Sequence, residues 1–438
     1  MDENYEIWPN VVSQGKRAEM TIHGLHAKTL RPGEKYNVHI ASMCNHTDVM
    51  TLEIVALPPE NIPLYCEARE GGRLEFQHTF TTVGEYSIFV SQPQNEEKKR
   101  VTIQRIYAVP PELARYKPYK GDLHIHTYYS DGRMSPIYMA VMAKKLGLDF
   151  AAITDHGKYA PSIEAIEKAR QINLNLLLLP GEEVAVPSAH IVSINANKCI
   201  TDLKGDDAMY QQQIREILET DLKNTRMVEN LTKEQYAPTK WAVKNIHAYG
   251  GYAFLAHPYW ISGNRYDLNL PIGEQLLQDG DIDGVEIIGG YTPTEFESNL
   301  LATAKYYSDL AQGRYIPVVG NSDTHSRPTN DIYGWYWTTV FAESLTADKI
   351  LEAILDCRSV ACEHPNGGHF RAYGPFDLVE YVCFLEREFF PLHDRISAME
   401  GELYFDILRG RAVSQEQLTL LKQHLAELYN TSEVKLGN

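Results

Sequence analysis

The feature that most constrains the fold is an alternation of apolar strands and helices that begins at residue 118. Most strand candidates are near-continuous apolar runs, as expected for strands buried on both faces of a sheet. They are Asp122–Thr127, Phe150–Thr154, Leu176–Leu179, His190–Asn195, Tyr252–Ala256, Gly284–Ile288 and Ile316–Val319. Strands alternating with helices predict an α/β domain, and this number of strands predicts a (β/α)7 barrel.

Helical segments separate most of these strands. The first has Ser135 as its N-cap and Pro136 in its first turn, and it stops at Gly147. The others are Ser162–Gln171, Gln211–Lys223, Thr239–Ala248 and Asn299–Ala311. Because the segment 199–238 is longer than one crossover needs, we expect it to form a lid or rim. In such barrels the active site lies at the C-terminal ends of the strands.

Residues 121–132 carry the densest polar pattern, Gly-Asp-Leu-His-Ile-His-Thr-Tyr-Tyr-Ser-Asp-Gly. His124 and His126 stand two apart, so on a strand both imidazoles point to the same face. Asp131 follows in a turn-like Ser-Asp-Gly and can fold back to supply a carboxylate. The alternative is an ordinary strand with two solvent-facing histidines.

Histidine or a carboxylate recurs at the ends of the other predicted strands. The candidates are Asp155, His156, Glu182, Glu183, His190, His257, Asp323 and His325. Such groups at the ends of buried strands are costly unless they are paired or bind metal. A few could instead be helix caps or turn residues, Asp155 and Asp323 among them. Imidazole mixed with carboxylate suits zinc, manganese or iron, and the lack of thiolates disfavours a structural zinc site.

These motifs resemble those of the PHP (polymerase and histidinol phosphatase) superfamily of metal-dependent hydrolases. The resemblance covers residues 118–365 and rests on stretches that follow the family order. They are Asp122-Leu123-His124-Ile125-His126-Thr127, Thr154-Asp155-His156, Gly181-Glu182-Glu183, Ala256-His257-Pro258 and Asn321-Ser322-Asp323-Thr324-His325. The resemblance implies a distorted, TIM-like (β/α)7 barrel that holds two or three divalent ions, Zn, Mn or Fe.

The resemblance also implies three sets of metal ligands. The first set is His124, His126, Glu183 and Asp323. The second is Glu183, His190 and His257, and the third is Asp131, His156 and His325. Glu183 is preferred to Glu182 because the family pattern is Gly-any-Glu. Some members have His where Asp131 stands, so the third ion depends most on that position.

The implied chemistry is hydrolysis by a hydroxide that bridges two ions, because such a water loses its proton near neutral pH. The chain has no G-x-S-x-G, Walker loop or dinucleotide fingerprint. The general acid could be Asp155, His257 or a metal-bound water, and Asp155 could instead orient an imidazole. Basic residues near the predicted rim are Arg133, Lys158, Arg265 and Arg327. We expect Arg327 to clamp the phosphate, with a plain surface arginine as the alternative.

We therefore predict a metal-dependent phosphoesterase that acts on a small-molecule phosphate ester. The 122–132 motif with an upstream β-domain also resembles the PHP branch related to carbaryl hydrolase, which would imply a carboxylic or carbamate ester hydrolase. A third alternative is a non-catalytic PHP domain that binds metal and a ligand. Tyr333, Trp335, Tyr336 and Trp337 could form an aromatic wall for a ligand, or they could pack in the core.

Residues 1–115 are predicted to form an immunoglobulin-like β-sandwich, because short strands alternate with turn signals. The strands are Lys35–Ala41, Val49–Leu57, Arg73–Thr81, Glu85–Ser91 and Arg100–Ile106. Residues 366–438 are predicted to be a C-terminal helical extension, in which Ser414 and Gln417 form a capping box. We expect this extension to pack on the barrel or to contact a second copy in a homo-oligomer.

The net charge, the apolar runs and the cysteines indicate which partners and which cellular location to expect. The 438 residues carry a net charge of −17, so we expect no extended nucleic-acid binding. No apolar run is long enough to span a membrane. The first residues are unlike a signal peptide, and the six cysteines form no C-x-x-C pair, so a cytoplasmic location with free thiols is expected. The alternatives are a trimmed leader peptide and a Cys44–Cys66 bridge.

Overall fold

The computed structural model describes residues 4–26, 29–43, 64–92, 100–187, 189–290, 296–326 and 332–431. The predicted strand Val49–Leu57, Cys44 and Arg327 lie outside these described residues. The chain divides into two compact units. Unit 1 comprises Met1–Tyr116, Glu380–His393 and Lys422–Asn438, and unit 2 comprises Lys117–Val379 and Asp394–Leu421. The division into domains 1–115, 118–365 and 366–438 stays a prediction.

Unit 1 contains two sheets whose inward side chains form one hydrophobic core. One sheet has the order β1-β3-β6, with strands Tyr5–Trp8, Arg17–Gly24 and Arg73–Thr79. The other has the order β2-β8-β7-β4-β5, with strands Val11–Ser13, Arg100–Val109, Gly84–Ser91, Lys35–Ser42 and Leu64–Glu67. Met20 and Ile22 of the first sheet and Ile88 and Val90 of the second belong to one buried cluster. This shared core supports the immunoglobulin-like β-sandwich, which stays a prediction.

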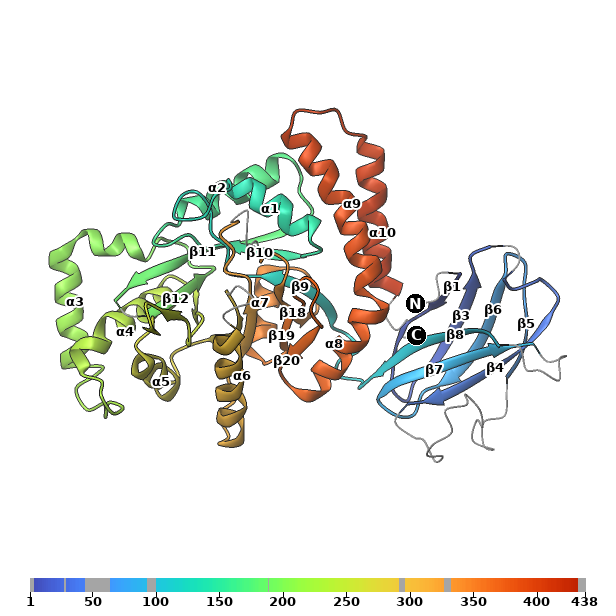
Figure 1. The fold of residues 1–438 in the computed structure, drawn as a ribbon, viewed down its shortest axis with the longest axis horizontal. Helices are drawn as coiled ribbons and strands as arrows, with labels where there is room; N and C mark the ends of the chain where they lie inside the picture. The colour runs from blue at the N-terminus through green and yellow to red at the C-terminus, as the bar shows by residue number, and fades with distance from the viewer. Residues whose placement is uncertain are drawn as a thin grey trace. The chain divides into compact units, whose positions relative to one another are not determined.

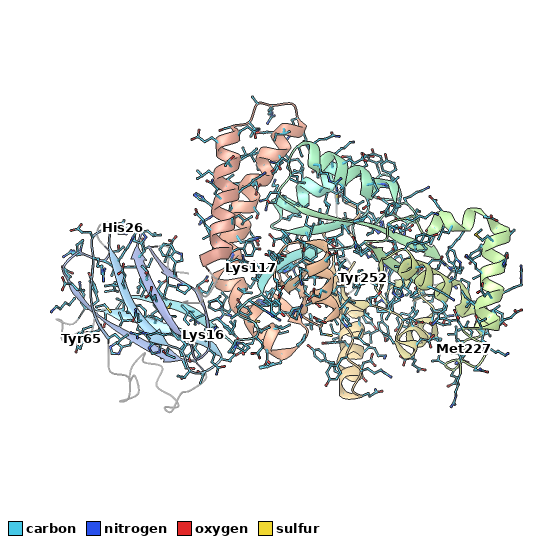
Figure 2. The ribbon with its side chains drawn as sticks, turned by 180° about the vertical axis from the view of Figure 1, so that it is seen from behind. Lys16, His26, Tyr65, Lys117, Met227 and Tyr252 are labelled. Atoms are coloured by element: carbon cyan, nitrogen blue, oxygen red, sulfur yellow. The ribbon has the colours of Figure 1, made fainter. Side chains whose placement is uncertain are left out.

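Unit 2 contains a ten-stranded sheet in the order β17-β16-β13-β12-β11-β10-β9-β18-β19-β20. Figure 1 labels its strands β9 to β12 and β18 to β20. Its strands in chain order, from β9 to β13, are Lys117–Asp122, Phe150–Ile153, Leu177–Val186, Ala189–Ile194 and Tyr252–Leu255. Those from β16 to β20 are Gly284–Gly289, Val318–Asn321, Tyr336–Ala342, Ser359–Glu363 and Arg371–Tyr373. Figure 2 marks Lys117 and Tyr252, the first residues of β9 and β13.

The sheet of unit 2 curls so that β9 and β17 come together at their C-terminal ends. Ile125 forms a parallel bridge with Thr324, and the His126 N–H donates to the Thr324 carbonyl over 3.0 Å. Strand β12 is antiparallel to both of its neighbours, β11 and β13. The fold is therefore mixed α/β with a curled sheet, and the (β/α)7 barrel stays the finer prediction.

The helices follow the predicted order, with differences at their starts. Their bounds from α1 to α5 are Pro136–Lys145, Ala160–Gln171, Asp207–Glu219, Lys233–Ala248 and Leu270–Asp279. Those from α6 to α10 are Phe296–Ala311, Ala347–Leu355, Phe376–Glu388, Phe390–Leu408 and Gln415–Thr431. Ser135 caps α1 as predicted, because its Oγ accepts from the Tyr138 N–H. Helix α4 begins well before Thr239, because Thr232 and Gln235 form a capping box and the helix accommodates Pro238.

Helix α5 and the strands after His325 were absent from the sequence prediction. Strand β18 pairs antiparallel with β9 and β19. Tyr333, Tyr336 and Trp337 are buried, and Trp335 packs partly buried against the core. These aromatic side chains therefore belong to the packed interior, which favours core packing over the ligand wall. The segment 199–238 holds the 3-10 helix Thr201–Gly205, α3 and the start of α4.

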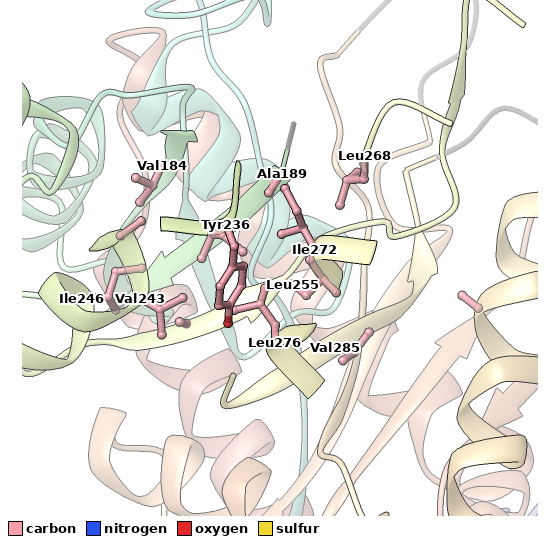
Figure 3. Close-up of a cluster of buried hydrophobic side chains, with 14 of the residues drawn as sticks. Val184, Ala189, Tyr236, Val243, Ile246, Leu255, Leu268, Ile272, Leu276 and Val285 are labelled. Carbon is pink, nitrogen blue, oxygen red and sulfur yellow. The ribbon is translucent and has the colours of Figure 1, made fainter. Parts of the chain in front are cut away.

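One large hydrophobic cluster of unit 2 lies between the sheet and helices α4 and α5 (Figure 3). It joins Val184, Leu255 and Val285 of the strands to Tyr236, Val243, Ile246, Ile272 and Leu276 of the helices. Burying one such side chain contributes about 1.5–3 kcal/mol. The cluster therefore holds in place the strands whose ends carry the polar residues described next.

Two further features bear on the composition-based expectations. Among the described residues, no helix is both long enough and apolar enough to cross a membrane. Cys66, Cys199, Cys357, Cys362 and Cys383 are free thiols.

Candidate metal centre

The structure brings all nine predicted ligands together at the strand ends of unit 2. They form four overlapping groups, and within each group the donor atoms lie within 4.8 Å of one another. The groups are His126–Asp131–His156–His325, His124–His126–Glu183, His124–His257–Asp323 and Glu183–His190–His257. The second and third predicted ligand sets each lie within one group, and His126 also joins the third. The first predicted set is divided, because Asp323 groups with His124 and His257 and not with His126 and Glu183.

Local backbone structure explains why these side chains converge. His124 and His126 continue the direction of β9, so their rings lie on the same side, with centroids 5.0 Å apart. His156 forms a parallel bridge with Glu183, which places the end of β10 beside β11. His257 and Asp323 adopt positive φ angles of 25° and 50° directly after β13 and β17. Non-glycine residues are rare in that region, and strained backbone of this kind clusters at functional sites.

Glu183 is the hub of the cluster. Its Oε2 lies 2.7 Å from His156 Nδ1, 3.3 Å from His124 Nε2 and 3.4 Å from His126 Nε2. Its Oε1 lies 2.5 Å from His190 Nδ1 and 3.7 Å from His257 Nε2. One buried carboxylate therefore faces five imidazoles.

Glu182 faces away from the cluster. Its carboxylate accepts hydrogen bonds from the Ile200 N–H and the Cys199 thiol. Because neighbouring side chains of a strand point to opposite faces, only one of the two glutamates can reach the imidazoles. The structure supports the choice of Glu183.

Inside the cluster, burial and the neighbouring charges shift the pKa of each ionisable side chain in opposite directions. Burial would raise the pKa of Glu183, but the charge of His124 and hydrogen bonds from three histidines outweigh it and hold that pKa well below its usual range. Burial would lower the pKa of His124, yet Asp323, Glu286 and Glu183 together raise it well above normal. The carboxylates are therefore stable as anions only because positive charge lies beside them.

The donor atoms fit a divalent cation. His126 Nε2 is buried and makes no hydrogen bond with good geometry among the described residues, although it lies 2.8 Å from Asp323 Oδ1. Imidazole nitrogens and carboxylate oxygens at such separations share an ion readily. Where each ion would bind stays a prediction.

Asp131 and its neighbours form a more exposed part of the cluster. The Asp131 side chain is 49% exposed, and its Oδ2 lies 3.1 Å from His325 Nε2. Burial would raise the pKa of Asp131, but the hydrogen bond from His325 and the neighbouring imidazoles lower it to about 2. His156 is also exposed, at 41% of its side chain. This part of the cluster is open to solvent.

Asp155 supports the loop that carries Asp131. Its Oδ1 accepts from the backbone N–H groups of Thr127 and Ser130 and from the Ser130 hydroxyl, at 2.8, 3.1 and 2.6 Å. Its Oδ2 accepts from the Thr127 hydroxyl at 2.7 Å. A carboxylate engaged in four such bonds is poorly placed to deliver a proton, so the geometry favours a positioning role over general acid catalysis.

Glu286 was missed by sequence reasoning. Its Oε2 lies 3.0 Å from His124 Nδ1 and accepts from Asn321 Nδ2 at 3.0 Å. The only signal in the sequence was a single carboxylate inside the apolar run of β16. A carboxylate on the outer nitrogen of a ligating histidine fixes its tautomer and ring orientation.

The chain was compared with known protein families, and the match covers the part of the chain that carries most of these ligands. Residues 122–269 match the PHP domain family, so this part of the chain is a PHP domain. Membership of the branch related to carbaryl hydrolase stays a prediction.

Two curated relatives cover this part of the chain. An uncharacterised protein of Methanocaldococcus jannaschii is 24% identical over 204 residues, which are 44% of this chain and 94% of that protein. The 5'-3' exoribonuclease Rnm of Salmonella typhimurium is 26% identical over 200 residues, or 34% of this chain and 67% of the relative.

Solved structures show a weaker likeness. A two-domain protein of Bacteroides vulgatus, which contains a predicted PHP-like metal-dependent phosphoesterase, is 20% identical with a TM-score of 0.41. That match covers 57% of this chain and 66% of that one. An amidohydrolase of Chromobacterium violaceum is 19% identical with a TM-score of 0.33, over 48% of this chain and 89% of its own.

Proposed function

We propose that this protein is a metal-dependent phosphoesterase that hydrolyses a phosphate ester of a small molecule. The observation that carries the proposal is the convergence of nine imidazole and carboxylate side chains, Glu183 among them, in overlapping groups. Membership of the PHP superfamily supports hydrolase chemistry. The relative that is an exoribonuclease supports a phosphate ester over a carboxylic ester.

The proposed ligands divide among three ions as the sequence resemblance implies. One ion would be held by His124, His126, Glu183 and Asp323, a second by Glu183, His190 and His257, and a third by Asp131, His156 and His325. When bound, such ions activate a water molecule for attack and neutralise negative charge on the phosphoryl oxygens. Zinc, manganese and iron all suit this set of donors.

The chain's own residues supply geometry around these ions. Asp155 holds the loop that presents Asp131, and Glu286 holds the ring of His124. His257 lies among the ligands, with Nε2 3.7 Å from Glu183 and 3.8 Å from Asp323. That position favours a metal-binding role for His257 over proton donation to the leaving group. The exposed Asp131 and His156 mark the side from which substrate and water reach the site.

A substrate panel tests the proposal. Protein loaded with Mn²⁺ or Zn²⁺ should cleave p-nitrophenyl phosphate or a nucleotide monophosphate faster than p-nitrophenyl acetate. His126→Ala and Asp323→Asn should abolish the activity, which would exclude a contaminating phosphatase. Efficient acetate or carbamate hydrolysis without phosphate release from any substrate would favour the carboxylic or carbamate ester hydrolase. Absence of all turnover in metal-loaded protein would favour the non-catalytic PHP domain.

The role of Arg327 as a phosphate clamp is part of this proposal. Arginine suits the two negative charges of a phosphate monoester because it donates charge-assisted hydrogen bonds. Arg327→Ala should raise KM for the phosphate substrate more than it lowers kcat, since it removes binding and leaves the nucleophile intact. An unchanged KM would remove Arg327 from the site.

A further inference from the structure

His190 lies between two carboxylates from different parts of the chain. Its Nδ1 is 2.5 Å from Glu183 Oε1, and its Nε2 is 3.0 Å from Asp267 Oδ2. Glu183 belongs to the ligand cluster, whereas Asp267 belongs to none of the groups of three or more donors among the described residues. Asp267 therefore lies beside the centre, next to His190, without being one of the grouped ligands.

Asp267 is held beside His190 by a short hairpin. Strands β14, Ile261–Ser262, and β15, Arg265–Tyr266, pair antiparallel, and the Asp267 N–H donates to the Trp260 carbonyl over 2.8 Å. The Trp260 ring stands edge-on to His257 and His190, with centroid distances of 5.7 and 6.2 Å. The base of the hairpin thus touches His190 and His257, the two histidines of the Glu183–His190–His257 group.

We propose that Asp267 is a positioning residue for the ion held by Glu183, His190 and His257. Its Oδ2, 3.0 Å from Nε2 of His190, favours the proton on that nitrogen and leaves the Nδ1 lone pair directed towards the position shared with Glu183. Carboxylate partners of this kind orient a ligating imidazole and increase its basicity. The inference rests on the proposed metal centre and adds a residue that holds no ion itself.

Glu286 shows the same arrangement on the opposite nitrogen. Glu286 faces Nδ1 of His124 and leaves Nε2 directed towards Glu183 and Asp323. Asp267 faces Nε2 of His190 and leaves Nδ1 for the cluster. Two carboxylates from different elements thus each face the ring nitrogen that points away from the cluster.

Metal-binding measurements test the role of Asp267. Competition with a chelator should resolve the affinity of each Mn²⁺ or Zn²⁺ in the full-length chain and its variants. Asp267→Ala should weaken one ion roughly 10- to 100-fold, the usual cost of losing such a partner, and leave the others unchanged. Asp267→Asn should have a smaller effect, because the amide oxygen still accepts the N–H but carries no charge.

Asp283→Asn is the matched control. Asp283 Oδ2 lies 2.7 Å from His247 Nε2, so it forms a histidine–carboxylate pair that belongs to none of the ligand groups. The control should bind every ion with wild-type affinity. Equal affinities in Asp267→Ala and wild type would overturn the inference, as would loss of all ions together with a lowered Tm. If the wild type binds less than one ion per chain, the proposed function fails instead.

Discussion

The ligand cluster has an inner part and an outer part that differ in burial and support. The inner part, His124, His126, Glu183 and His257, has side chains at most 3% exposed. The outer part, Asp131, His156 and His325, has side chains between 17% and 49% exposed. The inner residues stand at the ends of strands, whereas Asp131 is carried by a loop that Asp155 holds.

This difference in burial determines how easily the carboxylates of each part stay ionised when no cation is bound. A buried carboxylate such as Glu183 loses its hydration and depends on neighbouring positive charge. Asp131 keeps much of its contact with water and remains ionised at little cost. We therefore expect the inner part to bind its ions tightly and the outer part to exchange its ion more readily.

The largest expected effect is that of Glu183→Gln. Removing the charge of the hub carboxylate should abolish hydrolysis and lower the bound metal by at least one ion per chain. Glu182→Gln is the control, because Glu182 faces Ile200 and Cys199 instead of the imidazoles. Activity assays and elemental analysis on both variants decide the matter. An inactive Glu182→Gln beside an active Glu183→Gln would refute the assignment of the hub.

A smaller effect is expected from Glu286→Gln, which changes the support of the inner part and no proposed ligand. The affinity for the most tightly bound ion should fall on the order of 10- to 100-fold, because His124 loses its charged partner. Glu363→Gln provides a comparison, since Glu363 is also buried but pairs with Arg371 and Tyr373. Chelator competition is the measurement. Equal loss in both variants would point to a general effect of removing a buried charge.

Asp131→Asn tests the outer part. The variant should lose one ion and keep the inner ions at wild-type affinity, because Asp131 appears in only one of the four ligand groups. Metal titration of the variant gives the stoichiometry. Loss of the inner ions as well would show that the two parts are not independent.

The smallest effect concerns a histidine–carboxylate pair outside the cluster. The hydrogen bond with Asp283 raises the pKa of His247. A raised folded-state pKa stabilises the protein fully below the unfolded value of about 6.5, and the gain disappears as pH rises through the folded value. His247 is 39% exposed, so solvent screening limits this gain to less than about 1 kcal/mol.

The measurement is thermal unfolding of wild type and His247→Gln at pH 5.5 and pH 8.5. The Tm difference between the two proteins should be larger at pH 5.5. A difference that is equal at both values, or larger at pH 8.5, would contradict the assigned direction of the pKa shift.

The sequence alone determined the candidate ligands because their positions follow local rules. Apolar runs marked the strands, and the period of two placed His124 and His126 on one face. The resemblance to the PHP superfamily then selected Glu183, and the hydrogen bonds of Glu182 explain that choice.

Only the tertiary structure revealed two of the residues that support the ligands. Glu286 meets His124, and Asp267 meets His190, across separations in sequence that no local pattern records. Tertiary pairing likewise placed Tyr336 and Trp337 in β18, where they are buried beside β9 and β19. Local spacing decides which face of a strand a side chain occupies, whereas contacts between distant segments depend on how the whole sheet curls.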